Sequence, residues 1–331
     1  MKQITQSFKR FFAAESAGGV VLAIAALAAL IVSNSSLADW YQGWLSLQGE
    51  VRIANDSLVL AKPLILWVND LWMAIFFFLV GLEIKHGLKD LKSAIVPIVA
   101  ALGGMIFPAL IFLAINPGSH LWATAMPTDI ALALGVLSLL GKRVQPQVRI
   151  FLLTLAIADD LFSLVVLGIF YGDDLEPEKA LATLGAAALG AVLPFTKSQL
   201  NKAIKVLSPI STYFIVPVII AVNIPLDIDL ASFTSHATLA LVLARGIGKI
   251  VGIALFAWIA IKLGSTAHLH IKEISGIGAL AGMGMTVSLV IAEIAAKNET
   301  ELNEVRLGLF ISAILSGLVG YIWLRRTLAS Q

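Results

Sequence analysis

The chain has 331 residues, of which 59% are hydrophobic and only 13% are charged, and its formal net charge is +2. Soluble domains are about half apolar and about a quarter charged, so this chain cannot cover itself with a surface that water would solvate. The composition therefore excludes a disordered chain, a nucleic-acid-binding protein and a cytosolic enzyme. The absence of cysteine also excludes disulfides and thiolate chemistry.

Ten apolar stretches follow one another along the chain, separated by connectors that are charged or rich in Gly, Pro and Asn. A bilayer span needs about 20 apolar residues. The first stretch follows Lys2, Lys9 and Arg10 but does not end in the small residues of a cleavage site, so we expect it to be retained. We predict an all-α polytopic membrane protein, one integral-membrane domain over residues 1–331. Its ten spans are expected at 17–36, 63–82, 94–115, 122–140, 150–171, 180–195, 208–224, 237–262, 274–296 and 306–324.

The distribution of lysine and arginine predicts the orientation of these spans, because cytoplasmic loops carry an excess of both residues. With a cytoplasmic N-terminus, sixteen of the 23 basic residues fall in inside segments and five in outside segments. The other two, Arg245 and Lys249, lie within a span. This bias alternates at every loop and predicts that both termini are cytoplasmic.

Charged residues inside the predicted spans mark candidate functional positions. Each costs about 2.5–3.5 kcal/mol at the centre of a transmembrane helix on insertion scales, so something must offset it. Asp70 lies near the outer end of its span and is expected to be an entrance carboxylate. The full set that we single out is Asp70, Asp129, Asp159, Asp160, Arg245 and Lys249.

The segment Pro127-Thr128-Asp129 predicts a broken helix in the fourth span. Proline removes a backbone N–H and clashes with the preceding turn. A membrane tolerates the carbonyls that a break frees only where they line a cavity or are buried in protein. Carbonyls beside a carboxylate and a hydroxyl are hard oxygen ligands, which suit a small hard cation or protons better than an organic solute.

Asp159 and Asp160 lie near the middle of the fifth span. Neighbouring residues on a helix point about 100° apart, so we expect one carboxylate to face a cavity and the other to find a different partner. Lys249 and Arg245 are the candidates of opposite charge. A lysine balanced between a paired and an unpaired state can release a proton when its partner changes occupancy. The alternative is a set of buried structural ion pairs, and for Arg245 a second counter-ion and a structural role both stay open.

Two further segments each allow two interpretations. The Gly-rich segment 276–286 indicates either close helix packing through small residues or a second broken helix. In the second interpretation, 94–171 and 237–324 are triplets of opposite topology with interrupted middle members, a pattern typical of a transporter's binding site. Glu83, followed by Lys85 and His86, is either a solvated helix end or part of a pH-responsive cluster.

Seven short motifs follow one another along nearly the whole chain. They are Phe76–Lys85 (FFFLVGLEIK), Thr128–Gly135 (TDIALALG), Leu139–Gly141 (LLG), Leu155–Asp160 (LAIADD), Gly248–Lys249 (GK), Gly282–Thr286 (GMGMT) and Gly320–Arg325 (GYIWLR). In this order the motifs resemble those of the NhaA-type sodium/proton antiporters. The resemblance implies an inverted-repeat antiporter fold with two broken helices that cross near the midplane of the membrane.

The resemblance also implies a function, namely electrogenic export of cytoplasmic Na⁺ (or Li⁺) in exchange for external protons across the bacterial inner membrane, for sodium and pH homeostasis. By motif, Na⁺ would bind at Asp160 and Asp159, and Asp159 would pair with Lys249. Asp129 and Thr128 would complete the cation- and proton-binding site at the helix crossing, and Glu83 would belong to a pH sensor. The expected partners are Na⁺, H⁺, the lipid bilayer and, as an option, a second copy of the chain. No cofactor, enzymatic activity or nucleic acid is expected.

The chain departs from the family pattern in three places. Between Tyr171 and Leu207 it is shorter by two spans, and the segment 180–195 resembles the eighth span of the family rather than the sixth. Gly87 stands where a second acid would follow Glu83, which would weaken or shift regulation by pH. Arg245 is a charge that the pattern does not include.

Two functions of other classes remain as alternatives at this point. A sodium-coupled organic-solute symporter on a related fold would place more amide and hydroxyl groups near the crossing. An intramembrane aspartyl protease would need two carboxylates close enough to share a proton, and it would gain nothing from adjacent aspartates or a buried lysine.

Overall fold

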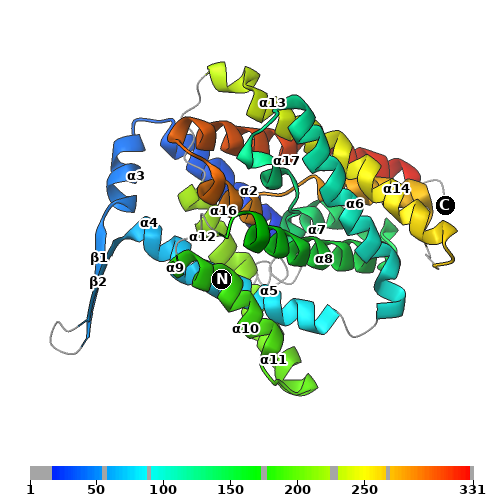
Figure 1. The fold of residues 1–331 in the computed structure, drawn as a ribbon, viewed down its shortest axis with the longest axis horizontal. Coiled ribbons are helices and arrows are strands. Elements are labelled where there is room, and N and C mark those ends of the chain that lie inside the picture. Colours follow the sequence, from blue (N-terminus) through cyan, green and yellow to red (C-terminus); the bar gives the residue numbers. More distant parts are fainter. Residues whose placement is uncertain are drawn as a thin grey trace, which may run out of the picture.

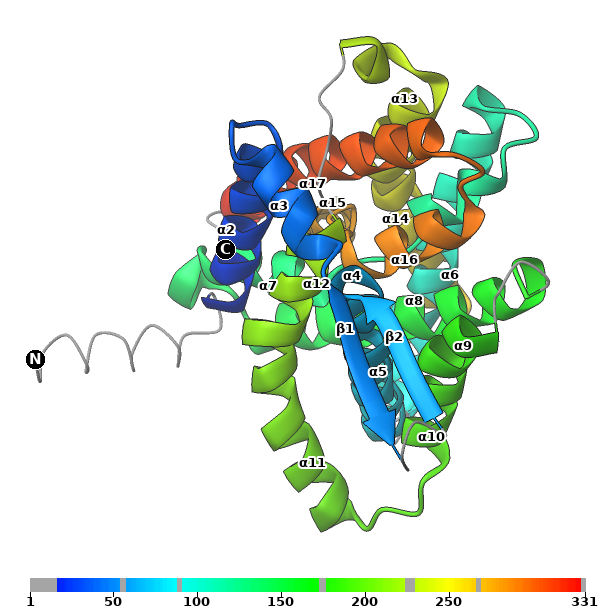
Figure 2. The same cartoon turned by 90° about the vertical axis from the view of Figure 1, so that its left-hand side faces the viewer.

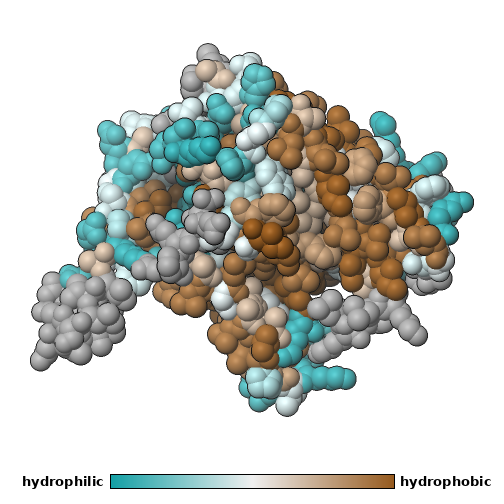
Figure 3. All heavy atoms as spheres, in the orientation of Figure 1, coloured by the Kyte–Doolittle hydropathy of each residue, from teal (hydrophilic) through white to brown (hydrophobic). Residues whose placement is uncertain are grey.

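The computed structural model describes residues 17–53, 58–87, 91–172, 177–223, 230–265 and 269–328. Helices cross one another around a buried centre in which α7, α8 and α16 lie (Figure 1). Within the described residues, seven helices are long and apolar enough to cross a membrane, or up to nine if each of two bent helix pairs counts as one span. Large apolar side chains are exposed along α6 and α14, and they form a hydrophobic belt between hydrophilic edges of the molecule (Figure 3).

Most helices belong to these candidate spans. In chain order they are α2 (Ala17–Ser33), α3 (Ala38–Leu45), α4 (Leu64–Trp67), η1 (Val68–Trp72), α5 (Met73–Gly87), α6 (Leu91–Ile115), η2 (His120–Ala125), α7 (Ile130–Ser138), α8 (Pro146–Phe170), α11 (Lys197–Ile210), η5 (Ser211–Ile215), α12 (Val216–Asn223), α13 (His236–Leu243), η7 (Ala244–Gly248), α14 (Lys249–Lys262), α15 (Ile271–Ala281), α16 (Thr286–Ala295) and α17 (Glu299–Thr327). The shorter elements are η3 (Gly141–Arg143), α9 (Pro177–Ala180), η4 (Leu181–Gly185), α10 (Ala186–Val192), η6 (Leu230–Thr234), β1 (Gln48–Ile53) and β2 (Leu58–Pro63).

The segment 180–195, predicted as the sixth span, contains one of the shorter apolar helices of the described residues. Its apolar helix, Leu181–Val192, is shorter than a membrane span. The helix ends because Leu193 is extended, as the residue before a proline prefers to be, and Pro194 follows. The short helix packs closely on α5, since a Cβ added at Gly190 would lie 2.2 Å from the Phe78 carbonyl oxygen.

The sequence predicts helices only, but the structure also contains a β-hairpin. After α2, the chain turns by 113° into α3 and then forms β1 and β2, which pair antiparallel with Gln48 opposite Pro63 and Ile53 opposite Leu58. The Trp67 indole N–H donates to the Gly49 carbonyl (3.0 Å) and so ties the base of the hairpin to α4. The hairpin projects from the helical body (Figures 1 and 2).

The crossing of α6 with α13–η7–α14 positions the charged centre. A Cβ at Gly103 would lie 2.2 Å from the Gly252 carbonyl oxygen, and one at Gly252 would lie 2.1 Å from the Gly103 carbonyl oxygen. The two backbones are therefore in direct contact, as small residues allow in membrane helices. This contact holds Arg245 and Lys249, which precede Gly252 on the same helix, inside the bundle, where both are fully buried.

Candidate functional site

Two interrupted helices meet at the centre of the molecule. The first has a 3-10 turn, η2, then the non-helical residues 126–129, then α7. The second consists of α15 and α16, which are bent by 51° around the residues between them. The Gly-rich segment is thus a break and not a continuous helix. Gly284 is required there, because a Cβ would lie 2.2 Å from the Pro127 carbonyl oxygen of the other break.

Asp129 and Thr128 join the two breaks to each other. The Asp129 N–H donates to the Met283 carbonyl (2.7 Å), and the Thr128 hydroxyl donates to the Ala281 carbonyl (2.8 Å). The Thr286 hydroxyl donates to Asp129 Oδ2 (2.6 Å), while Asp129 Oδ1 accepts the first N–H groups of α7. Asp129 therefore lies at the N-termini of α7 and α16, where a carboxylate is stabilised by the helix dipoles.

The structure pairs Lys249 with Asp159. The ammonium group lies 2.7 Å from Asp159 Oδ2 and 3.0 Å from the Thr128 hydroxyl, and neither partner of the ion pair is exposed. The pair thus links α14 to α8 and, through Thr128, to the first break. Burial in protein strengthens such a pair and makes the loss of either partner costly.

Three buried oxygen atoms on α8 have no hydrogen-bond partner among the described residues: Asp159 Oδ1, Asp160 Oδ1 and Ser163 Oγ. Ser163 follows Asp159 by four positions and Asp160 by three, so these side chains share a region of the helix surface. Buried polar atoms are normally bonded, and unpaired hard oxygens are available to a hard cation or a proton.

The electrostatic environment of Asp160 is crowded with negative charge. Asp159, Asp129 and Glu83 repel it and Lys249 attracts it. Glu83 lies half-buried on α5, and its carboxylate acts on Asp160 through its charge. Asp70 is not part of the centre: it forms an ion pair with Lys62 of β2 (2.9 Å) near the hairpin.

Arg245 contacts both breaks through four hydrogen bonds. Its Nε donates to the Gly282 carbonyl (3.0 Å), one terminal nitrogen to the Thr124 carbonyl (2.7 Å) and to the Ser288 hydroxyl (3.0 Å), and the other to the Pro127 carbonyl (2.6 Å). Arg245 lies in the π-helical segment η7. Such π-bulges are frequent at functional sites.

Sequence reasoning missed several polar residues near the centre and beyond it. Ser163 and Ser288 are neutral, and small hydroxyl residues are common in membrane helices, so no sequence signal distinguished them. Asn69 and Asn223 bond to each other (3.0 and 2.7 Å), and Asn69 also donates to the Glu293 carboxylate (3.2 Å). Glu293 lies within the predicted span 274–296 and could have been found by the same charge argument as Asp129.

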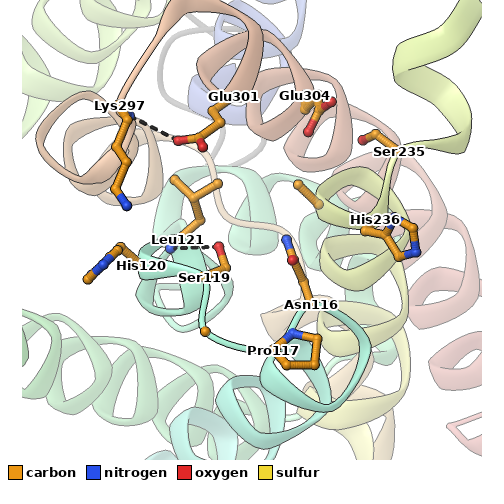
Figure 4. Close-up of a pocket in the computed structure, with 12 residues that line it drawn as sticks. Asn116, Pro117, Ser119, His120, Leu121, Ser235, His236, Lys297, Glu301 and Glu304 are labelled. Atoms are coloured by element: carbon orange, nitrogen blue, oxygen red, sulfur yellow. Dashed lines mark hydrogen bonds between the residues drawn. The ribbon is translucent and has the colours of Figure 1, made fainter.

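A cavity of about 440 Å³ opens at the end of the bundle where α6 ends and α13 and α17 begin. Figure 4 shows Lys297 on one side, His120 and Ser119 below it, and Ser235 and His236 across from them. Glu301 accepts a hydrogen bond from the Lys297 backbone N–H (2.9 Å). Neither this cavity nor any other part of the described residues contains a group of three or more His, Asp or Glu side chains arranged to hold a metal ion. The central site offers two carboxylates and a hydroxyl rather than such a cluster.

The family model described as "Na+/H+ antiporter 1" matches residues 9–197 and residues 181–324. The two matches overlap at 181–197, so the short helix in this region fits the family pattern twice.

Among curated relatives, the Na(+)/H(+) antiporter NhaA of Albidiferax ferrireducens is 36% identical over 382 aligned positions, which cover 97% of this chain and 97% of the relative. The NhaA proteins of Escherichia coli K12 and Shigella boydii serotype 4 are 34% identical over 383 positions, covering 96% of this chain and 97% of each relative. Because the chain has only 331 residues, at least 51 of the 382 aligned positions (382 less 331) are gaps in it.

Proposed function

The chain belongs to the NhaA family of Na⁺/H⁺ antiporters, and from this premise we propose that it exports Na⁺ (or Li⁺) from the cytoplasm in exchange for external protons, at a site built around Asp160. It is a multi-pass membrane transporter and not an enzyme. Membership of this family favours the antiporter over the two alternatives that the sequence left open, an intramembrane protease and an organic-solute symporter. Location in a bacterial inner membrane, with both termini cytoplasmic, is part of the proposal.

The observation that carries the proposed site is the set of unpaired oxygens on α8. Asp160 Oδ1, Asp159 Oδ1 and Ser163 Oγ are buried and unbonded among the described residues. Both oxygens of Asp129, in contrast, already accept hydrogen bonds. We therefore assign cation and proton binding to Asp160 and Asp159, with Ser163 as a third ligand. Asp129 and Thr128 hold the crossing in place.

Exchange follows from competition at these oxygens. A carboxylate that binds Na⁺ cannot at the same time hold a proton on the same lone pair, so arrival of one cargo favours departure of the other. Lys249 would add a second titrating group, because a cation that draws Asp159 away leaves its ammonium unpaired in a buried site. If more than one proton moves per Na⁺, each net charge is worth about 2.3 kcal/mol per 100 mV of membrane potential.

The residues at the edges have supporting roles in the proposal. Glu83 interacts with Asp160 from the side of α5, which suits a carboxylate on the cytoplasmic route to the site. Asp70, paired with Lys62, would lie at the outer rim. A homodimer is also proposed, since the projecting β1–β2 hairpin is paired only with itself in the described part of the chain and unpaired strand edges are suited to pairing with another copy.

The test of the proposed function is Asp160→Asn in everted membrane vesicles, read by fluorescence dequenching of a pH probe on addition of Na⁺. The amide cannot carry the negative charge that Na⁺ or H⁺ neutralises, so we expect Na⁺-dependent proton movement to fall to background while the protein remains inserted. Asp39→Asn is the matched control, because Asp39 is an exposed aspartate on α3 and its loss should leave exchange unchanged. Wild-type exchange in Asp160→Asn would contradict the site, and no exchange in the wild type would contradict the function.

A further inference from the structure

Arg245 and Lys249 lie one helical turn apart, yet they contact different groups. Lys249 bonds to Asp159 and Thr128, whereas the Arg245 guanidinium bonds to three backbone carbonyls and one hydroxyl of the two breaks. Both side chains are fully buried. The two positive charges of the centre are thus separated into one that meets a carboxylate and one that meets the peptide backbone.

Two of the three carbonyls that Arg245 binds lie at the C-terminal ends of half-helices, and the third lies in a break. Thr124 lies in the last turn of η2, Gly282 is the C-cap of α15, and Pro127 lies in the break between η2 and α7. Carbonyls at a helix C-terminus have no partner within the helix and carry partial negative charge. Gly284 shows how closely the guanidinium is fitted, because a Cβ there would lie 1.8 Å from an Arg245 terminal nitrogen.

From this geometry we propose that Arg245 is a positioning residue that fixes the helix crossing and supplies a constant positive charge to the centre. This inference rests on the proposed function. A guanidinium stays protonated in proteins and can form several bonds in a fixed plane, whereas an ammonium is a single point charge that can lose its proton. Arg245 therefore holds both breaks through the whole transport cycle.

Charged side chains from several helices act on Arg245 and on Asp160. Asp159 and Asp129 attract Arg245, and Lys249 repels it. Asp160 is repelled by Asp159, Asp129 and Glu83 and attracted by Lys249. The other helices packed on η7, namely α6, α13, α15 and α17, carry their charged residues near their ends. With Asp129, Asp159 and Asp160 ionised and both cations charged, the centre has one net negative charge, which one monovalent cation neutralises.

Loss of the constant charge has a signature that differs from loss of structure. In Arg245→Gln the centre carries one more net negative charge, so it holds both protons and Na⁺ more tightly. We expect the half-maximal pH of Na⁺ exchange, measured at Na⁺ well below saturation, to move up by about 1 unit, and Na⁺ binding to purified protein at alkaline pH to become about tenfold tighter. A purely structural role would instead weaken Na⁺ binding and leave the half-maximal pH in place.

Arg245→Lys separates charge from bonding. It keeps the positive charge but not the four bonds, so we expect the wild-type half-maximal pH with a reduced maximal rate. Arg325→Gln is the matched control, because Arg325 is exposed at the end of α17, and it should behave as wild type. If Arg245→Gln does not accumulate in the membrane, Arg245→Lys alone tests the proposal. The wild-type half-maximal pH supports it, and a shift of about 1 unit contradicts it.

The proposal is overturned if Arg245→Gln keeps the wild-type half-maximal pH or binds Na⁺ more weakly, or if Arg245→Lys shifts as far as Arg245→Gln. These outcomes leave the antiport function intact. Failure of the proposed function would appear separately, as absence of Na⁺-dependent proton movement in the wild type itself.

Discussion

Buried aspartates at the centre differ in what surrounds their oxygens. Asp129 accepts hydrogen bonds from two backbone N–H groups and from Thr286, so it has little capacity left for a ligand. Asp160 and Asp159 each keep one buried oxygen without a partner among the described residues. In the proposed function, Asp129 therefore holds the helix crossing, whereas Asp160 and Asp159 bind the cation.

The Lys249–Asp159 ion pair should be visible in stability. Lys249→Met leaves Asp159 buried without its counter-charge, so we expect a loss of about 3–5 kcal/mol, seen as a lower melting temperature of the purified protein in detergent. The double variant Lys249→Met/Asp159→Asn removes both charges together and should recover much of that loss. If the double variant is as unstable as the sum of the single variants, the two side chains do not form the pair described here.

At the same scale, the sequence predicted charged residues better than neutral ones. Asp129, Asp159, Asp160 and Lys249 stood out because a charge is expensive inside an apolar span. Ser163 could not be predicted, because a serine hydroxyl has no comparable cost and its importance depends on facing the same region as Asp160. Nor could the partners of Arg245 be predicted, since they are backbone carbonyls brought together by two breaks that are far apart in the chain.

Among the elements, breaks were predictable where proline or glycine caused them. Pro127 predicted the interruption before α7, although the first half proved to be a 3-10 turn rather than an α-helix. The hairpin was not predicted, even though Glu50-Val51-Arg52-Ile53 alternates polar and apolar residues as a strand would. Four residues of alternation within a connector are a weak signal, and the pairing with β2 is supported by α4 through the hydrogen bond from Trp67 to Gly49.

The α6–α14 crossing depends on glycine at the point of contact. In Gly252→Ala the new methyl group would meet the Gly103 carbonyl oxygen at 2.1 Å, so the helices must separate, and we expect a loss of about 1–3 kcal/mol together with a lower exchange rate. Thermal melting in detergent and vesicle dequenching measure the two effects.

Gly246→Ala is the control for that change. Gly246 lies in η7 of the same continuous helix, and nothing lies within 4 Å of a Cβ built there. Its stability should equal or slightly exceed that of the wild type, because alanine favours helical backbone over glycine. Equal losses in the two variants would mean that the contact between α6 and α14 is not what makes Gly252 necessary.

For the whole molecule, the two matches to the family model meet at one place. The family model matches twice over 181–197, and there the chain forms a short helix, Leu181–Val192, packed on α5. The elements that build the centre, α6 to α8 and η7 to α17, lie on either side of this place. Both breaks, Asp160 and Lys249 therefore lie outside the overlap of the two matches.

The orientation of the molecule in the membrane can be tested directly, because the natural chain has no cysteine. Asp39 and Lys202 are both exposed, and the alternation of basic residues places Asp39 outside and Lys202 in the cytoplasm. In Asp39→Cys we expect a membrane-impermeant maleimide to label the protein in intact cells. In Lys202→Cys we expect labelling only in everted vesicles. The cysteine-free parent must stay unlabelled in both preparations, and the opposite pattern of labelling would reverse the direction in which Na⁺ is proposed to move.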